Sequence, residues 1–139
     1  MNDIRKAFAA FWGSFLDRGG FPPANALIPA WQTGYVPRAN ADTFPRITYD
    51  IARPDFADFT ILSASIWDRR QQEGFFGLVD DVLAQVANKI PHDGGTMLRW
   101  DKGALWLLRS SPFFNYLDDP DDQTITRGII RTAVRSYVL

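Results

Sequence analysis

The chain has 139 residues, a formal net charge of −1 at pH 7 and no cysteine. This length suits a single domain over residues 1–139, and the 46% of hydrophobic residues is enough for a packed core and argues against disorder. Without cysteine there are no disulfides and no thiolate metal sites, and the balanced charge argues against a dedicated nucleic-acid-binding protein.

The N-terminal segment has the spacing of an amphipathic helix. Large apolar residues recur at helical intervals from residue 4 to residue 15, and Asn2 or Asp3 is a suitable N-cap. We expect a helix over 3–17 that stops at Gly19–Gly20, and not a secretion signal, because no small-residue cleavage site follows the apolar run. No apolar stretch approaches the ~20 residues of a membrane-spanning helix, so no membrane association is expected.

A long connection follows the helix, over residues 21–44, and is rich in proline, glycine and alanine. Connections of this length are uncommon inside a compact domain and are usually functional. Its large apolar side chains must be buried by contact with other residues, either of this subunit or of a neighbouring one. We therefore predict an arm in which Trp31 and Tyr35 anchor a partner.

The remainder of the chain predicts strands with one further helix. Period-two patterns predict the strands, and a wide apolar stripe predicts the helix. In chain order we expect strands over 45–51 and 59–69, a helix over 72–90, a hairpin of strands over 96–100 and 104–109, and a final strand over 124–139. The order α-β-β-α-β-β-β predicts an α+β domain whose mainly antiparallel sheet of about five strands has both helices on one face.

The predicted final strand carries arginines on one face only. Arg127, Arg131 and Arg135 share that face, whereas apolar residues and a threonine occupy the other. Such a row suits a face that meets water, a partner subunit or nucleic acid. The alternative is a set of ion pairs to the acidic turn or to Asp80 and Asp81, which the near-neutral net charge favours over nucleic acid.

An acidic turn over residues 118–122 precedes this strand. It consists of Asp118, Asp119, Asp121 and Asp122 around a proline. Carboxylates are suitable Ca²⁺ ligands, yet the spacing is not that of an EF-hand, so we expect neither metal nor cofactor. We expect these carboxylates to pair with the arginine row between subunits, because a head-to-tail ring needs two complementary patches.

No catalytic motif is present, and we expect no enzyme activity. The one histidine, His92, stands beside Asp93 in a glycine-rich turn that backbone geometry explains. Nucleotide-binding loops, nucleophile elbows and zinc-binding helices are absent. Two alternatives of other classes are a ligand-binding or enzymatic domain with a pocket lined by Trp67, Trp100 and Trp106, and a DNA-binding regulator.

Several short patterns occur in order along nearly the whole chain. They are the arm over 26–37, Phe44–Tyr49, Ile66–Arg69, Val79–Asp81 and Arg109–Phe114, followed by the acidic turn and the final strand. In this order they resemble the tail-completion, or tail-terminator-like, minor tail proteins of long-tailed bacteriophages and prophages.

The resemblance implies a structural virion protein, without enzymatic activity, that caps or completes the tail tube and offers the surface for head–tail joining. Terminator-type members assemble as hexameric rings. The implied partners are therefore further copies of the chain, the tail tube protein and head–tail connector proteins, with DNA only passing through the ring lumen. The implied location is the tail or neck of the virion, after assembly in the host bacterial cytoplasm. A head–tail connector or neck protein is the nearest alternative.

Overall fold

The computed structural model describes residues 3–16, 26–51, 59–69, 78–118, 121 and 124–138. In chain order its elements are α1 (Ile4–Trp12), β1 (Ala30–Gln32), the 3-10 helix η1 (Arg38–Asn40), β2 (Arg46–Tyr49), β3 (Thr60–Arg69), α2 (Leu78–Lys89), β4 (Thr96–Trp100), β5 (Gly103–Asp118) and β6 (Ile125–Val138). The expected α+β class with two helices is confirmed, although the described sheet has six strands and not about five.

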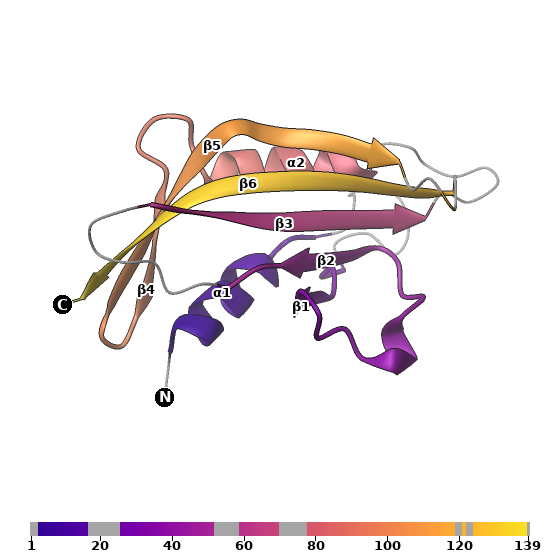
Figure 1. Ribbon diagram of the computed structural model, residues 1–139, viewed down its shortest axis with the longest axis horizontal. Helices are drawn as coiled ribbons and strands as arrows, with labels where there is room; N and C mark the ends of the chain where they lie inside the picture. Colours follow the sequence, from indigo (N-terminus) through magenta and orange to yellow (C-terminus); the bar gives the residue numbers. More distant parts are fainter. Residues whose placement is uncertain are drawn as a thin grey trace.

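The strands form one mixed sheet in the order β1-β2-β3-β6-β5-β4. All neighbours are antiparallel except β1 and β2, which run parallel. The long strands β3, β5 and β6 run side by side, and the β4–β5 hairpin bends steeply away at one end, so that the sheet curls (Figure 1). The fold is therefore built around the β3–β6–β5 ladder.

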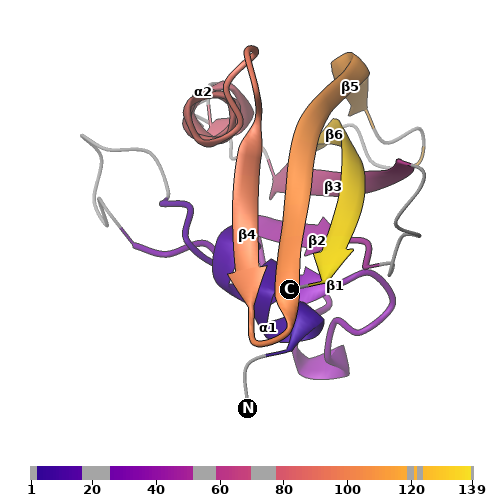
Figure 2. The same ribbon diagram turned by 90° about the vertical axis from the view of Figure 1, so that its left-hand side faces the viewer.

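Both helices cover the same face of this curled sheet (Figure 2). On β6 the residues at even positions from 128 to 136 are buried beneath the helices, whereas those at odd positions from 125 to 137 are partly exposed. The predicted alternation of the final strand is thus confirmed. The largest side chains that are fully buried in the core are Phe8, Phe15, Ile47, Ile66, Ile90, Leu105, Leu107, Ile130, Val79, Val82, Val86 and Val134.

Strand β1 corrects the prediction of an irregular connection over residues 21–44. Its three residues pair with β2, where Ile47 donates its N–H to the carbonyl oxygen of Pro29 at 2.9 Å and Thr33 donates to Tyr49 at 2.8 Å. A strand this short has no periodicity, so its pattern was indistinguishable from a loop. Residues 17–25 lie outside the described part.

Helix α1 is shorter than the predicted 3–17. It begins at the predicted N-cap, Asp3, whose side chain accepts a hydrogen bond from the N–H of Lys6 at 3.0 Å. It ends at Trp12 because Gly13, a poor helix former, is the C-cap. The chain then runs to Leu16, whose backbone N–H and C=O both bond the side-chain amide of Gln85, at 3.0 and 2.9 Å.

Strand β5 is longer than the predicted 104–109. It continues to Asp118, and the register with β6 shifts between Arg109 and Phe114. The predicted strand stopped at Arg109, but β6 continues as a partner beyond the irregularity and the ladder resumes. The predicted helix over 72–90 is found from Leu78 onward, and residues 70–77 are outside the described residues.

Candidate functional site

The helix-free face of the sheet carries the arginines predicted from the final strand. Arg127, Arg131 and Arg135 are all partly exposed there. Helix α2 packs on the other face, as the position of Val79 against Gly128 indicates. Asp80 and Asp81 belong to α2, so the predicted alternative of ion pairs between these carboxylates and the arginine row has no support from their placement.

The strand register adds residues from other strands to this open face. Arg46 on β2 is opposite Trp67 on β3, and Trp67 is in turn opposite Arg127 on β6. The Cζ atom of Arg46 lies 5.4 Å from the Trp67 ring centroid, and the Cζ atom of Arg127 lies 4.5 Å from it. One indole ring thus lies between two guanidinium groups.

A second aromatic ring, that of Phe44 just before the start of β2, extends this row. The Phe44 centroid lies 4.8 Å from Cζ of Arg46 and 4.6 Å from Cζ of Arg69. Cation and ring therefore alternate through Arg69, Phe44, Arg46, Trp67 and Arg127, which we call the arginine stack. Contacts of this kind contribute about 0.5–1 kcal/mol each at exposed sites.

Hydrogen bonds hold the members of the arginine stack in place. Trp67 donates from Nε1 to Oγ1 of Thr48 at 2.9 Å, and Arg127 donates from Nε to Oγ of Ser65 at 3.0 Å. Arg46 donates from Nη1 to the carbonyl oxygen of Ala41 at 2.6 Å. Side chains of neighbouring strands and a backbone carbonyl thus hold three of the five members of the stack.

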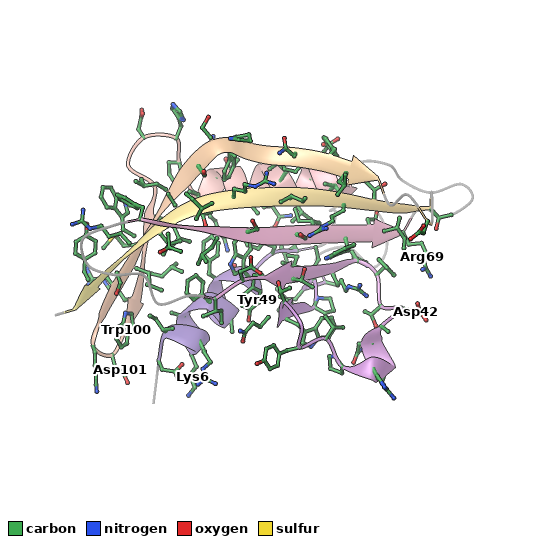
Figure 3. The ribbon with its side chains drawn as sticks, in the orientation of Figure 1. Lys6, Asp42, Tyr49, Arg69, Trp100 and Asp101 are labelled. Carbon is green, nitrogen blue, oxygen red and sulfur yellow. The ribbon has the colours of Figure 1, made fainter. Side chains whose placement is uncertain are left out.

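Positive charge is concentrated in this row. Burial lowers the pKa of Arg46, and the nearby Arg69 lowers it further, against the opposing effect of Asp42. Burial also lowers the pKa of Arg127, with Arg131 adding to the effect and Asp50 opposing it. Figure 3 places Arg69 and Asp42 at the same end of the molecule.

The far end of the open face is aromatic and apolar. The Cζ atom of Arg135 lies 5.8 Å from the ring centroid of Phe59 and 5.4 Å from that of Tyr137. Phe59 also packs against Trp106, and the adjacent Ile61 is 53% exposed. Arginine, aromatic and apolar side chains together are typical of the central part of a protein interface.

The middle arginine of the row has a different neighbour. With its amide oriented to satisfy both of its groups, Asn115 accepts a hydrogen bond from Nη1 of Arg131 at 2.8 Å. The three arginines of β6 therefore have distinct environments: Arg127 belongs to the stack, Arg131 contacts β5, and Arg135 lies among aromatic rings.

The predicted acidic turn begins where β5 ends. Asp118 is opposite Thr126, at the end of the sheet that also holds Arg127, and Asp121 is exposed. Asp119 and Asp122 lie outside the described residues. Because Arg135 lies eight residues beyond Arg127, roughly 27 Å along the strand, Asp118 and Arg135 are near opposite ends of β6.

The structure separates the two predicted anchors of the arm. Trp31 is in β1 opposite Thr48, which places it in the open-face row that continues to Ser65 and Ile129, and it is partly buried. Tyr35 follows β1 and is 70% exposed. Trp31 therefore adjoins the arginine face, whereas Tyr35 extends into solvent.

The three tryptophans of the predicted pocket are not brought together. Trp67 is beside Arg127, and Trp106 is opposite Arg135 at the other end of β6. Trp100 packs against the core on the helix-covered face, at the end of the molecule opposite Arg69 (Figure 3). His92 and Asp93 are exposed in the turn before β4. Within the described ranges no three His, Asp or Glu side chains are grouped to hold a metal.

Sequence reasoning missed Phe44, Arg46 and Arg69 as part of the candidate surface. The alternation of Arg46, Thr48 and the apolar residues between them indicated a two-faced strand. The partner of that strand, which is what places Arg46 beside Trp67, follows from long-range pairing that the sequence does not state.

No helix of the described residues is long and apolar enough to cross a membrane. No protein-family model matches this chain, and no curated protein matches it at a significant level.

Proposed function

We propose that this chain is a structural virion protein that caps or completes the tail tube of a long-tailed phage or prophage, as one subunit of a hexameric ring. The observation that supports the proposal is the division of the sheet into a face covered by two helices and an open face of arginine and aromatic residues. Surfaces of this composition are typical of protein interfaces. The ordered patterns that resemble tail-completion proteins supply the biological setting.

Ring closure requires two unlike and complementary surfaces on each subunit. Arg127, Arg131 and Arg135 supply positive charge on the open face, and the acidic turn over 118–122 supplies negative charge. Tyr35 adds an exposed aromatic anchor, and Trp31 adjoins the open face. In the proposed ring these two surfaces meet between neighbouring subunits.

The ring would join two further partners. The tail tube protein meets one side of it and the head–tail connector proteins meet the other, while DNA passes through the lumen without being read. Assembly takes place in the host bacterial cytoplasm, and the finished location is the tail or neck of the virion.

Native mass spectrometry at several protein concentrations and two salt concentrations tests the ring directly. We expect a hexamer that weakens at high salt, because screening reduces the attraction between exposed charges. The purified chain is then added to polymerising tail tube protein, and electron microscopy measures tube length. A chain that stays monomeric and leaves tube length unchanged contradicts the proposal.

Two variants connect the ring to the candidate surface. Trp31→Ala and Arg131→Ala are expected to lose hexamer and tube capping, whereas Lys102→Ala, in the exposed turn between β4 and β5, retains both. Wild-type assembly by the first two variants would show that the interface lies elsewhere on the molecule.

A further inference from the structure

The described sheet has one free edge at β1 and another along the second half of β5. Strand β4 pairs with β5 only over residues 103–107, whereas β5 continues to Asp118 beside β6. Strand β1 is the last strand on the opposite side. In Figure 1, β1 lies below β2, and β5 is the uppermost of the long strands. The unpaired N–H and C=O groups of an edge strand can pair with a strand of another chain.

The last part of β5 lacks the features that usually prevent such pairing. Charged side chains, prolines and bulges commonly protect an edge strand. Here the register irregularity and the exposed Pro112 precede Phe114, and the segment 114–117 that follows has no charge and no proline. Tyr116 is 54% exposed and Leu117 is 48% exposed, although both are large and hydrophobic. This part of β5 is therefore suited to accept a further strand.

Backbone hydrogen bonds show which groups of β1 face its free edge. The carbonyl oxygen of Pro29 and the N–H of Thr33 both bond β2. In a parallel ladder every second residue directs its backbone groups to the same neighbour, so Ala30 and Gln32 direct theirs away from β2. The carbonyl oxygen of Gln32 accepts the N–H of Tyr35 at 2.9 Å in the turn that follows. The N–H and C=O of Ala30 and the N–H of Gln32 thus face the free edge.

Strand directions determine how these two edges can meet. The pairings make β2 and β6 run in the direction of β1, and β3 and β5 in the opposite direction. Rotation of a copy about an axis parallel to the strands preserves these directions and keeps the helices of every copy on the same side of the sheet. The β5 edge of one copy and the β1 edge of the next are then antiparallel, which is the more stable form of pairing.

We infer that β1 of one copy pairs antiparallel with the second half of β5 of the next copy, so that the sheets of neighbouring subunits join into one continuous sheet. This inference rests on the proposed function for the closed ring and its number of copies. The two edges are unlike, as a ring requires, whereas a contact between identical surfaces closes after two copies.

The width of the sheet agrees with closure around a lumen. Between one joint and the next lie the strands β1, β2, β3, β6 and β5. Five strands at about 4.8 Å each span about 24 Å, so six copies give a circumference of roughly 144 Å and a diameter of about 46 Å. A ring of this size has room for duplex DNA in its lumen.

The faces of the two strands indicate a register. Antiparallel partners direct their side chains to the same face, and Trp31 and Leu117 both belong to the open face. Trp31 opposite Leu117 of the next copy covers this exposed leucine with an indole ring. The same register places Gln32 opposite Tyr116 of the next copy. Strand β4 does not interfere, because it pairs with β5 no farther than Leu107, ten residues before Leu117.

Introduced cysteines report this contact directly, because the chain has no cysteine of its own. The probe is the full chain with Gln32→Cys and Tyr116→Cys, oxidised with copper phenanthroline and separated on a non-reducing gel. Directly opposite residues of antiparallel strands have Cα atoms about 4.5–5.5 Å apart, which is within the range of a disulfide. We expect a ladder of linked species up to the hexamer. Each single variant should remain unlinked, because its cysteine meets no cysteine on the next copy.

The matched control combines Gln32→Cys with Lys102→Cys, in the exposed turn between β4 and β5, and should give no ladder. Circular dichroism checks that each variant is folded. Thr33→Cys with Asn115→Cys is a second pair in the same register, at two exposed positions, and replaces the first pair if that variant does not fold.

Linked dimers from Tyr116→Cys alone would overturn the inference, because they would show that two β5 edges pair with each other. The absence of a ladder from both double variants, while native mass spectrometry detects the hexamer, would sink this inference alone. A ladder from a chain that leaves tube length unchanged would support the strand pairing and sink the proposed function. A chain that is monomeric by native mass spectrometry and gives no ladder would sink both.

Discussion

Arg109 on β5 donates a hydrogen bond from Nε to the carbonyl oxygen of Ile90 at 2.7 Å. Its Nη2 atom donates to the carbonyl oxygen of Ala87 at 2.9 Å, and its Cζ atom lies 4.8 Å from the ring centroid of Phe113. Carbonyl groups at the C-terminal end of a helix have no partner within the helix. Arg109, on the helix-covered face opposite Thr132, therefore closes the end of α2 from the sheet.

Replacement of Arg109 by Met is expected to lower the free energy of unfolding by about 2–4 kcal/mol. The reason is the loss of two charge-assisted hydrogen bonds to carbonyl groups that are then left without partners. Urea denaturation followed by circular dichroism measures the change. Arg99→Met, at an exposed position of β4, is the control and should change the stability by less than about 0.5 kcal/mol. Equal stability of the two variants would contradict the capping role.

These arginines illustrate how far the sequence predicts the candidate site. The partial exposure of Arg127, Arg131 and Arg135 followed from the period of two within one strand, which is a local property. The position of Arg46 beside Trp67 depends on the pairing of β2 with β3 and of β3 with β6, across sequence separations of about 20 and 60 residues. Local periodicity contains no information about such pairing.

The fold shows the same division between local and long-range information. Strand β4 has its predicted bounds, Thr96–Trp100, because a tight turn and a regular hairpin define it locally. Strand β1 was missed because its three residues are ordered by a parallel neighbour, and the second half of β5 was missed because β6 holds it beyond an irregularity. In both places, tertiary pairing overrides a local sequence that favours a loop.

Gly128 allows α2 to pack closely on β6. A Cβ atom at this position would lie 2.6 Å from Cγ1 of Val79 and 2.9 Å from Cε2 of Phe114, which is too close for either side chain to stay in place. Gly128→Ala is therefore expected to reduce the free energy of unfolding by about 1–3 kcal/mol through overpacking.

A double-mutant cycle with Val79→Ala tests that explanation. Because Val79→Ala removes the methyl groups that meet the new Cβ atom, the double variant should be more stable than the sum of the two single changes predicts. Thermal or urea unfolding of the four proteins gives the coupling free energy. Strictly additive effects would show that steric conflict with Val79 is not the cause.

Tyr49 makes stability depend on pH at alkaline values. Its ring is 5% exposed and packs against Trp12, with the ring centroids 6.4 Å apart. Burial raises the pKa of Tyr49 in the folded state above its usual value near 10. Above pH 10 the unfolded chain therefore loses this proton while the folded chain retains it. The stabilisation is complete below pH 10 and is lost as the pH rises through the pKa of the folded state.

Urea denaturation of wild type and Tyr49→Phe at pH 7, 9, 10 and 11 measures this contribution. The stability of the wild type should fall more steeply between pH 9 and pH 11 than that of Tyr49→Phe, which cannot ionise at this position. Comparison of the two proteins at each pH removes the effect of the other titrating groups. Parallel pH profiles would mean that ionisation of Tyr49 does not differ between the folded and unfolded chains.

A substitution at Tyr35 tests assembly without changing stability much, because the Tyr35 side chain is 70% exposed and contributes little to the core. Tyr35→Ala should change the free energy of unfolding by less than about 0.5 kcal/mol. In the proposed ring, loss of an exposed aromatic anchor raises the subunit concentration that is needed for half-assembly by about tenfold or more, since such anchors contribute ~2 kcal/mol or more. Lys102→Ala, in the exposed turn between β4 and β5, is the control and should assemble like wild type. Analytical ultracentrifugation over a concentration series provides the comparison, and equal assembly by the two variants would place the arm outside the subunit contact.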